Sequence, residues 1–272
     1  MPGTAGGLTS ADGTALACDR YGEGPAVVLV QGAFADRRHP QMTAIATALA
    51  PWFTVYSYDR RGRGGSGDTP PYAVGREIED LAAVVVAAGG SAMVFGGSSG
   101  AALALEAAAV NPAIVKLAVW EPPYHVDDSA PALPGDFARR LGDLVAAGRR
   151  AEAVERFMVE AAEVPAAVVA GMRADPSWPA IEAVAHTLAY EAAVLGPGNA
   201  LPADRLAAIT RPTLVLNGEL SPAWMANAGA AVAAAVPGAV RRVLEGQAHN
   251  VAPEALVPEL LEFFVAARKS FA

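Results

Sequence analysis

The stretch VFGGSSGAALALEAAA, residues 94–109, contains the pattern Gly-x-Ser-x-Gly with Ser98 at its centre. The apolar run SAMVF precedes the pattern and a run rich in alanine and leucine follows it, so it lies between a predicted strand and a predicted helix. A sharp turn of this kind requires very small neighbours, which Gly96 and Gly100 provide. We therefore predict that Ser98 is a nucleophile exposed at the edge of a sheet. The alternative is a glycine-rich turn that only packs the helix on the strand.

The composition indicates a folded domain with a sizeable core. The chain has 272 residues, of which 53% are hydrophobic and 18% are charged. Its net charge of -8 argues against a nucleic-acid partner, because phosphates attract a basic surface. The single cysteine, Cys18, cannot form an internal disulfide. We see neither a secretory signal nor an apolar run that could span a bilayer, so we expect a cytoplasmic protein without a membrane partner.

Predicted strands and helices alternate along the first and last parts of the chain. Asp12-Gly13 is typical of a hairpin turn, and the apolar runs PAVVLV, WFTVYSYD, SAMVF, IVKLAVW, PTLVLNG and AVRRVLEG are typical of strands. Residues 124–206 show only helical patterns. The order of elements predicts an α/β fold with a mostly parallel sheet of about eight strands and helices on both faces. We expect residues 1–123 and 207–272 to form this core and residues 124–206 to form a helical cap inserted in it.

A serine nucleophile needs a general base, and His249 is our candidate. It lies in LEGQAHNVAPE, after the last predicted strand, and in a doubly wound sheet this loop shares the carboxyl edge with the turn at Ser98. His125 follows a Glu-Pro-Pro turn and is the second candidate. We assign His39 to a solvated helix start and His186 to the cap, where it either packs or borders a pocket.

The acid that orients the histidine has two candidates. In this type of sheet the acid often follows the strand before the last, but Ser221 occupies that position in NGELSP. Glu219 lies two residues earlier, where a solvated loop carboxylate is the alternative interpretation. Glu121 ends the strand that follows the helix after Ser98, and its strand end lies on the same sheet edge as His249. We favour Glu121, with Glu219 as the second choice and no acid as the third.

Acyl transfer also needs donors for the negatively charged oxygen of the tetrahedral intermediate. We predict the backbone N–H of Ser99 as one donor. The second is expected from QGAF, residues 31–34, with the N–H of Ala33 as our candidate; an ordinary exit from the strand is the alternative. We assign six aromatic or sulfur-containing residues to substrate binding: Phe34, Tyr124, Met158, Trp178, Tyr190 and Trp224.

Together, the entry hairpin, the YDRRGRGGSG loop, the GGSSGA turn, the helical insertion and the GQAH loop resemble the α/β-hydrolase family over nearly the whole chain. GGSSGA followed by a glutamate at the next strand end is similar to the zearalenone-lactonase type. This resemblance implies Glu121 as the acid and Ala33 and Ser99 as oxyanion donors. It also implies that Asp59 and the arginines of its loop brace neighbouring loops. Epoxide hydrolases and haloalkane dehalogenases carry aspartate where this chain has Ser98, so both are excluded.

The expected function is a serine hydrolase that cleaves a carboxylic ester or lactone of a largely apolar small molecule through a Ser-His-Glu triad and an acyl-enzyme. No cofactor and no metal are predicted, and a homodimer is left open. One alternative is a non-hydrolytic enzyme on the same scaffold, such as a cyclase, a lyase or a cofactor-free oxygenase. Another is a ligand-binding relative, against which the pair Ser98 and His249 argues, because a binder needs no activated nucleophile.

Overall fold

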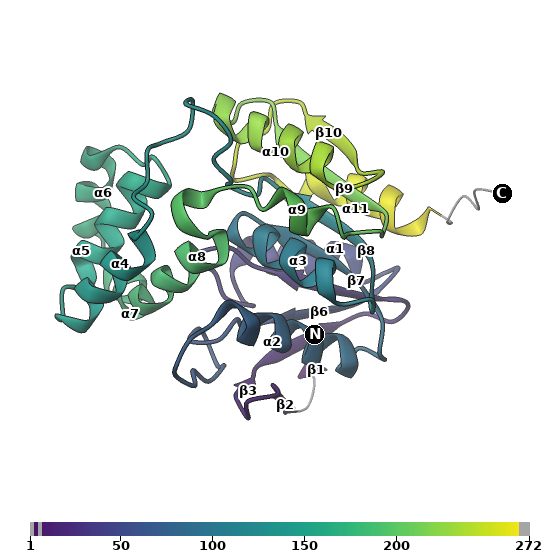
Figure 1. Cartoon of the computed structure of the whole chain (residues 1–272). Coiled ribbons are helices and arrows are strands. Elements are labelled where there is room, and N and C mark those ends of the chain that lie inside the picture. Colours follow the sequence, from purple (N-terminus) through teal and green to yellow (C-terminus); the bar gives the residue numbers. More distant parts are fainter. Residues whose placement is uncertain (1–2, 5–6, 267–272) are drawn as a thin grey trace.

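A single eight-stranded sheet organises the chain (Figure 1). The structure, a computed structural model, describes residues 3–4 and 7–266. The strands lie in the spatial order β1-β4-β6-β5-β7-β8-β9-β10. Their bounds are Gly3–Thr4 (β1), Cys18–Tyr21 (β4), Ala26–Val30 (β5), Thr54–Tyr58 (β6), Ala92–Gly97 (β7), Ile114–Trp120 (β8), Thr213–Gly218 (β9) and Val240–Leu244 (β10). The strands from β6 to β10 in this spatial order pair in parallel, whereas β4 pairs antiparallel with both β6 and β1, which confirms the predicted mostly parallel sheet.

The predicted hairpin forms outside this sheet. It pairs β2 (Leu8–Thr9) with β3 (Ala15–Leu16). Its turn is fixed by Asp12, whose Oδ1 accepts a hydrogen bond from the N–H of Thr14 at 3.0 Å, and by Gly13, which has a φ of 85°. A positive φ is easiest for glycine, so Asp-Gly is the sequence signal for this turn.

Helices cover both faces of the sheet because its central strands are apolar on both sides. In β5, Val28 and Val30 pack on the side covered by α2 (Val74–Ala87), α3 (Ser99–Val110) and α10 (Ala223–Ala235). Val27 and Leu29, which alternate with them, pack on the opposite side against α1 (Pro40–Leu49) and α11 (Pro253–Val265). This doubly covered sheet holds the loops of its carboxyl edge in fixed positions.

The described residues between β8 and β9 form helices and only one isolated strand-type bridge, between His125 and Ala200. The helices are α4 (Phe137–Ala146), α5 (Arg150–Arg156), α6 (Ala166–Arg173), α7 (Trp178–Ala183), α8 (Leu188–Leu195) and α9 (Ala203–Leu206), with a π-helical turn at Phe157–Ala161 and 3-10 turns at Ala185–Thr187 and Pro197–Asn199. In Figure 1, α4 to α7 stand to one side of the sheet, and α8 lies between them and the core.

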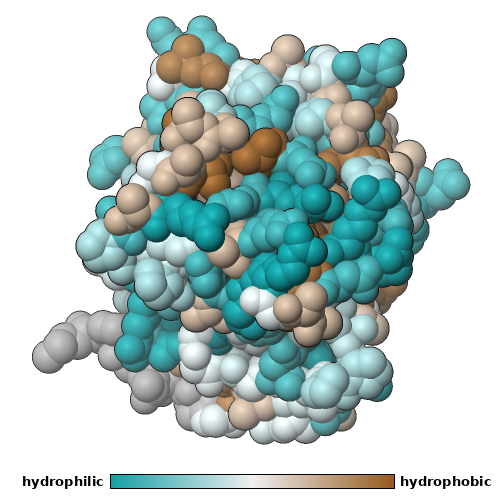
Figure 2. All heavy atoms as spheres, turned by 90° about the vertical axis from the view of Figure 1, so that its left-hand side faces the viewer, coloured by the Kyte–Doolittle hydropathy of each residue, from teal (hydrophilic) through white to brown (hydrophobic). Residues whose placement is uncertain are grey.

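The helices of this cap bury one face each. Phe137, Leu141 and Leu188 belong to a separate hydrophobic cluster, against which Ala33 and Phe34 of the core pack. Figure 2 faces the outer side of the cap, where hydrophilic side chains prevail and hydrophobic ones are scattered between them. The stretch 151–163, which lies within the region of helical patterns, divides into α5 and the π-helical turn. Among the described residues, no helix has the length and apolar character that crossing a membrane requires.

Candidate active site

Ser98 occupies a strained turn between β7 and α3. Its φ of 55° and ψ of -129° lie outside the regions that a residue with a side chain prefers, and such strain is concentrated at functional sites. The turn requires glycine two residues before Ser98, since a methyl group on Gly96 would come 2.5 Å from the carbonyl oxygen of Gly100. The N–H of Ser98 donates to the carbonyl of Trp120 in β8 at 2.8 Å. Neighbouring strands therefore fix the serine at the carboxyl edge of the sheet.

Glu121 and His249 form the pair that orients the histidine. Nδ1 of His249 lies 2.7 Å from Oε2 of Glu121, whose side chain is fully buried. The other carboxylate oxygen, Oε1, accepts the N–H of Gly218 at 2.8 Å. A carboxylate can only accept, so the proton of a neutral His249 ring belongs on Nδ1. Nε2 is then left with a lone pair that can take a proton.

The backbone around His249 is also held in place. Its carbonyl accepts the indole N–H of Trp120 at 2.9 Å and the N–H of Val251 at 3.0 Å. His249 and Ser98 line the same cavity. The described contacts include no hydrogen bond between these two side chains, a contact that often forms only with substrate bound.

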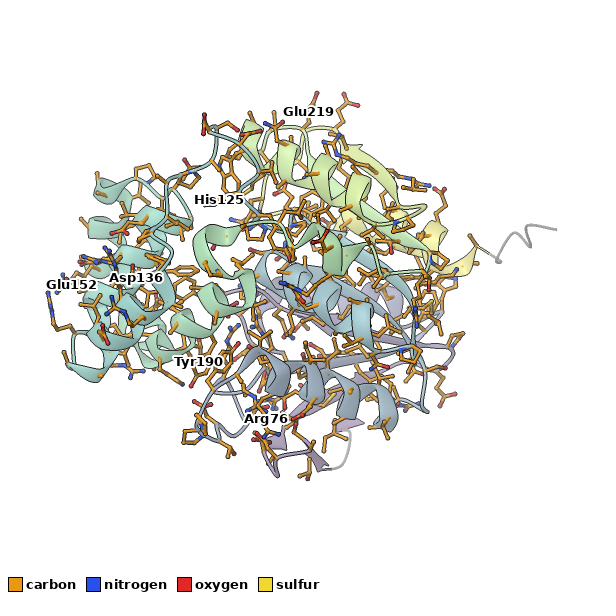
Figure 3. All side chains as sticks on the ribbon, viewed as in Figure 1. Arg76, His125, Asp136, Glu152, Tyr190 and Glu219 are labelled. Carbon is orange, nitrogen blue, oxygen red and sulfur yellow. The ribbon has the colours of Figure 1, made fainter. Side chains whose placement is uncertain are left out.

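The alternative acid lies elsewhere. Oε2 of Glu219 accepts the N–H of Gly246 at 2.9 Å, and the side chain is exposed at the top of the view in Figure 3. Ser221, at the usual acid position, has a buried hydroxyl without a hydrogen-bond partner in the described structure. The structure thus brings Glu121, rather than either of these residues, to His249.

Two backbone N–H groups are available to an oxyanion. Ala33 and Ser99 both line the cavity, and neither N–H donates to another residue among those described. Gly32 lies directly against the serine, because a methyl group built on it would be 2.9 Å from Cβ of Ser98. The predicted donors therefore flank the candidate nucleophile.

The cavity has a volume of about 420 Å³ and lies between core and cap. None of its described lining residues is Asp, Glu, Lys or Arg. Its larger apolar members are Phe34, Met42, Ile45, Phe95, Trp120, Phe137, Phe157, Met158, Val164, Met172, Leu195, Trp224, Met225, Val251 and Leu256. Such a cavity is of ordinary size for a small-molecule site, and its lining is mostly apolar with a few polar groups.

Three of the six predicted substrate contacts, Phe34, Met158 and Trp224, line this cavity. The other three predictions require correction. Tyr124 is fully buried in the sheet–helix core, and Trp178 is buried among the cap helices.

Tyr190 stacks on Tyr72 with ring centroids 3.8 Å apart and donates to Asp68 at 2.9 Å, at the junction of cap and core (Figure 3). Sequence reasoning missed Asn199, which lines the cavity, because no motif marks it.

The other histidines lie outside the Glu121–His249 pair. His125 packs edge-on against Trp224 with centroids 5.3 Å apart, and burial lowers its pKa. His186 lies 3.2 Å from a guanidinium nitrogen of Arg150, and burial likewise lowers its pKa. His39 is exposed and borders the cavity.

Asp59 joins the loops beside the site, as the resemblance implies. Its carboxylate accepts the N–H groups of Arg37 and Gly65, each at 2.7 Å.

Among the described residues, no group of three or more His, Cys, Asp or Glu side chains is placed to hold a metal ion.

Residues 27–259 match the family described as "Alpha/beta hydrolase family". Among solved structures, an alpha/beta hydrolase from Sphaerobacter thermophilus DSM 20745 is 54% identical, with a TM-score of 0.88 over 95% of this chain and 99% of that one. No curated protein matches the chain.

Two more distant structures share the fold. A thermophilic esterase from Thermogutta terrifontis is 23% identical, with a TM-score of 0.68 over 96% of this chain and 95% of that one. An enol-lactonase from Burkholderia xenovorans LB400 is 22% identical, with a TM-score of 0.66 over 94% and 98%. The family match covers most of the chain, and the 54% identical alpha/beta hydrolase matches over nearly its whole length. The chain therefore belongs to the alpha/beta hydrolase family.

Proposed function

We propose that this chain is a serine hydrolase of carboxylic esters or lactones, with neutral and largely apolar small molecules as substrates. The observation that carries the proposal is the buried Glu121 carboxylate, bonded to both His249 and Gly218, at the cavity lined by Ser98. A serine, a histidine and a carboxylate in this arrangement are the groups that acyl transfer requires. The esterase and the enol-lactonase named above bear on the fold alone.

The chemistry proceeds in two halves. His249 Nε2 takes the hydroxyl proton of Ser98 while its Oγ forms a bond to the substrate carbonyl carbon. The N–H groups of Ala33 and Ser99 bind the resulting oxyanion. The bond to the leaving oxygen then breaks, and that oxygen takes the proton from His249, so an acyl-serine remains.

In the second half, water gives a proton to His249 and its oxygen bonds to the acyl carbon. The bond to Ser98 breaks, the serine recovers its proton, and a carboxylic acid leaves. For a lactone, the alcohol and the acid belong to one molecule. Glu121 keeps the proton of the neutral ring on Nδ1 and stabilises the doubly protonated ring that forms in each half.

The lining of the cavity supports a neutral substrate. Transfer of a carboxylate from water into an apolar cavity is strongly unfavourable unless a cationic partner compensates it. The described lining offers no Lys or Arg for that purpose. Absence of an acid beside His249 would have favoured the non-hydrolytic alternative. Glu121 lies beside His249 instead, and no observation favours that alternative.

A fluorophosphonate probe tests the proposal, because it forms a covalent adduct with an activated serine much faster than with other side chains. We expect mass spectrometry to locate the adduct on Ser98, with no adduct in Ser98→Ala. We also expect turnover of p-nitrophenyl esters whose acyl chain carries no charge. A matched ester whose acyl chain carries a free carboxylate should be turned over poorly. An unlabelled Ser98 together with no ester turnover would contradict the proposed function. Comparison of p-nitrophenyl esters with a macrolactone then separates the two substrate classes.

A further inference from the structure

Four buried charged side chains lie together beside the loop that carries Ala33. Arg60 and Arg63 follow β6, Glu77 belongs to α2, and Glu191 belongs to the cap helix α8; none is more than 3% exposed. Arg60 donates through Nε and Nη2 to the two oxygens of Glu77 at 2.7 and 2.8 Å. Glu191 accepts from Nη1 of Arg60 at 2.8 Å and also pairs with Nη2 of Arg63. Two cations and two anions thus form a neutral cluster across the junction of core and cap.

Further donors of the two arginines bind the backbone of residues 31–32. Nη1 of Arg60 lies 3.2 Å from the carbonyl oxygen of Gln31. Nη1 of Arg63 donates to the carbonyl oxygen of Gly32 at 2.6 Å. Hydrogen bonds from a charged donor are about twice as strong as those between neutral groups. The carbonyls of this loop are therefore held firmly on the side of the arginines.

The carbonyl of Gly32 and the N–H of Ala33 belong to the same peptide group. This peptide bond is trans, so its C=O and N–H point in opposite directions. When Arg63 holds the oxygen on the side of the charge cluster, the N–H faces the opposite side, where Gly32 and Ala33 line the cavity. The cationic donor on the oxygen also polarises the amide and makes its N–H a stronger donor.

We propose that Arg63 is a positioning residue that aims the N–H of Ala33 at the oxyanion, and that Glu191 of the cap helix keeps Arg63 in place. This inference rests on the proposed function, in which the N–H of Ala33 is an oxyanion donor. The negative charge on the oxygen is largest in the tetrahedral transition state, so correct aim lowers its energy more than that of the bound ester. Loss of Arg63 therefore lowers kcat and leaves KM nearly unchanged.

The test compares Arg63→Met with Arg61→Met. Arg61 is a matched control, because it is buried in the same loop but pairs with Asp12 and Asp80 and has no described contact with residues 31–32. The readouts are kcat and KM with a p-nitrophenyl ester, the thermal midpoint, and the affinity of a trifluoromethyl ketone. This ketone forms an oxyanion on an activated serine, so its affinity reports the donors directly.

For Arg63→Met we expect kcat to fall about 10- to 100-fold, since removal of one whole oxyanion donor lowers kcat by about 10²–10³. KM should stay within about threefold, and the ketone affinity should fall with kcat/KM. Arg61→Met should lower the thermal midpoint and leave kcat and the ketone affinity within about threefold. A merely structural role of Arg63 would move the midpoint without this selective loss of ketone affinity.

Glu191→Gln is the second variant, because it keeps the shape of the side chain and removes its charge. We expect kcat to fall about three- to tenfold with a matching loss of ketone affinity, and this variant decides the question if Arg63→Met does not fold. Parental kcat and ketone affinity in folded Arg63→Met, or an equal loss of both in Arg61→Met, would overturn the inference. A parent protein without esterase activity and without label on Ser98 would instead overturn the proposed function.

Discussion

Replacement of Glu121 by glutamine tests the core of the site, because it removes one charge and changes no shape. The amide has one oxygen and one NH₂ group, where the carboxylate has two acceptors. In the parent protein, Oε1 of Glu121 accepts the N–H of Gly218, and Oε2 lies 2.7 Å from Nδ1 of His249. If the NH₂ group faced Gly218, two donors would meet in a buried place. The amide oxygen therefore faces Gly218, and the NH₂ group faces His249.

This orientation forces the wrong tautomer on the histidine. Nδ1 has to accept from the NH₂ group, so the proton moves to Nε2, where the ring can no longer take the proton of Ser98. The productive tautomer would require the NH₂ group to face Gly218, which leaves a buried N–H unsatisfied. Such an unsatisfied N–H costs about 1–3 kcal/mol and disfavours the productive tautomer by that amount. Loss of the charged hydrogen bond to the protonated ring adds about 1.5–3 kcal/mol to the barrier. Since about 1.4 kcal/mol is a factor of ten, kcat/KM should fall about 10²- to 10⁴-fold.

The assay is the initial rate of p-nitrophenyl ester hydrolysis, together with the rate of fluorophosphonate labelling and the thermal midpoint. Glu219→Gln is the matched control, because the described side-chain hydrogen bond of Glu219 is to the N–H of Gly246, and this variant should retain kcat/KM within about twofold. A folded Glu121→Gln that keeps more than about a tenth of the parental kcat/KM would refute the tautomer reasoning. A large loss in Glu219→Gln instead would assign the acid to the other carboxylate.

Three more predictions follow from close packing and from burial. In Gly32→Ala the new methyl lies 2.9 Å from Cβ of Ser98, so we expect kcat/KM to fall at least about tenfold. The free energy of unfolding, measured with urea, should fall by no more than about 1–3 kcal/mol. Full activity of this variant would contradict the close approach. In Gly229→Ala the methyl collides with Oδ1 of the buried Asn217, and the free energy of unfolding should fall by about 1–3 kcal/mol, whereas an unchanged urea midpoint would argue against this packing. Burial lowers the pKa of His186 in the folded protein below its unfolded value of about 6.5, so the unfolded chain binds more protons and stability falls as the pH drops through that value. His186→Asn should therefore lose less of its thermal midpoint between about pH 7 and 5 than the parent, and an identical loss would count against the lowered pKa.

The sheet could be predicted from the sequence because its strands are short, apolar on both faces and separated by turns. AVVLV and TLVLNG are examples, and both form strands where expected. Helix boundaries inside the cap were harder to predict. The stretch 151–163 has a continuous helical pattern, yet its second half winds into a π-helical turn that places Met158 in the wall of the cavity. Periodicity alone does not distinguish these two windings.

The part of the site that lies in loops at one edge of the sheet could be predicted from the sequence. Ser98, Glu121 and His249 each follow a predicted strand, so parallel topology alone brings them to that edge. The aromatic contacts were less predictable, because every cap helix buries apolar residues. Trp178 faces the other cap helices and Trp224 faces the cavity, and their sequences carry no signal for that difference.

The neutral charge cluster also bears on how the chain folds. Arg60 and Arg63 belong to the core, but Glu191 arrives with the cap, more than 120 residues later in the sequence. Without α8, Arg63 lacks its described carboxylate partner and Arg60 keeps only Glu77, and loss of one partner of a buried ion pair costs about 3–5 kcal/mol. A core that folded ahead of its cap would carry this penalty, and so would a core from which the cap detached. We therefore expect cap and core to unfold in a single cooperative transition. Each part needs the charged side chains of the other to neutralise its own, although the two parts differ in architecture.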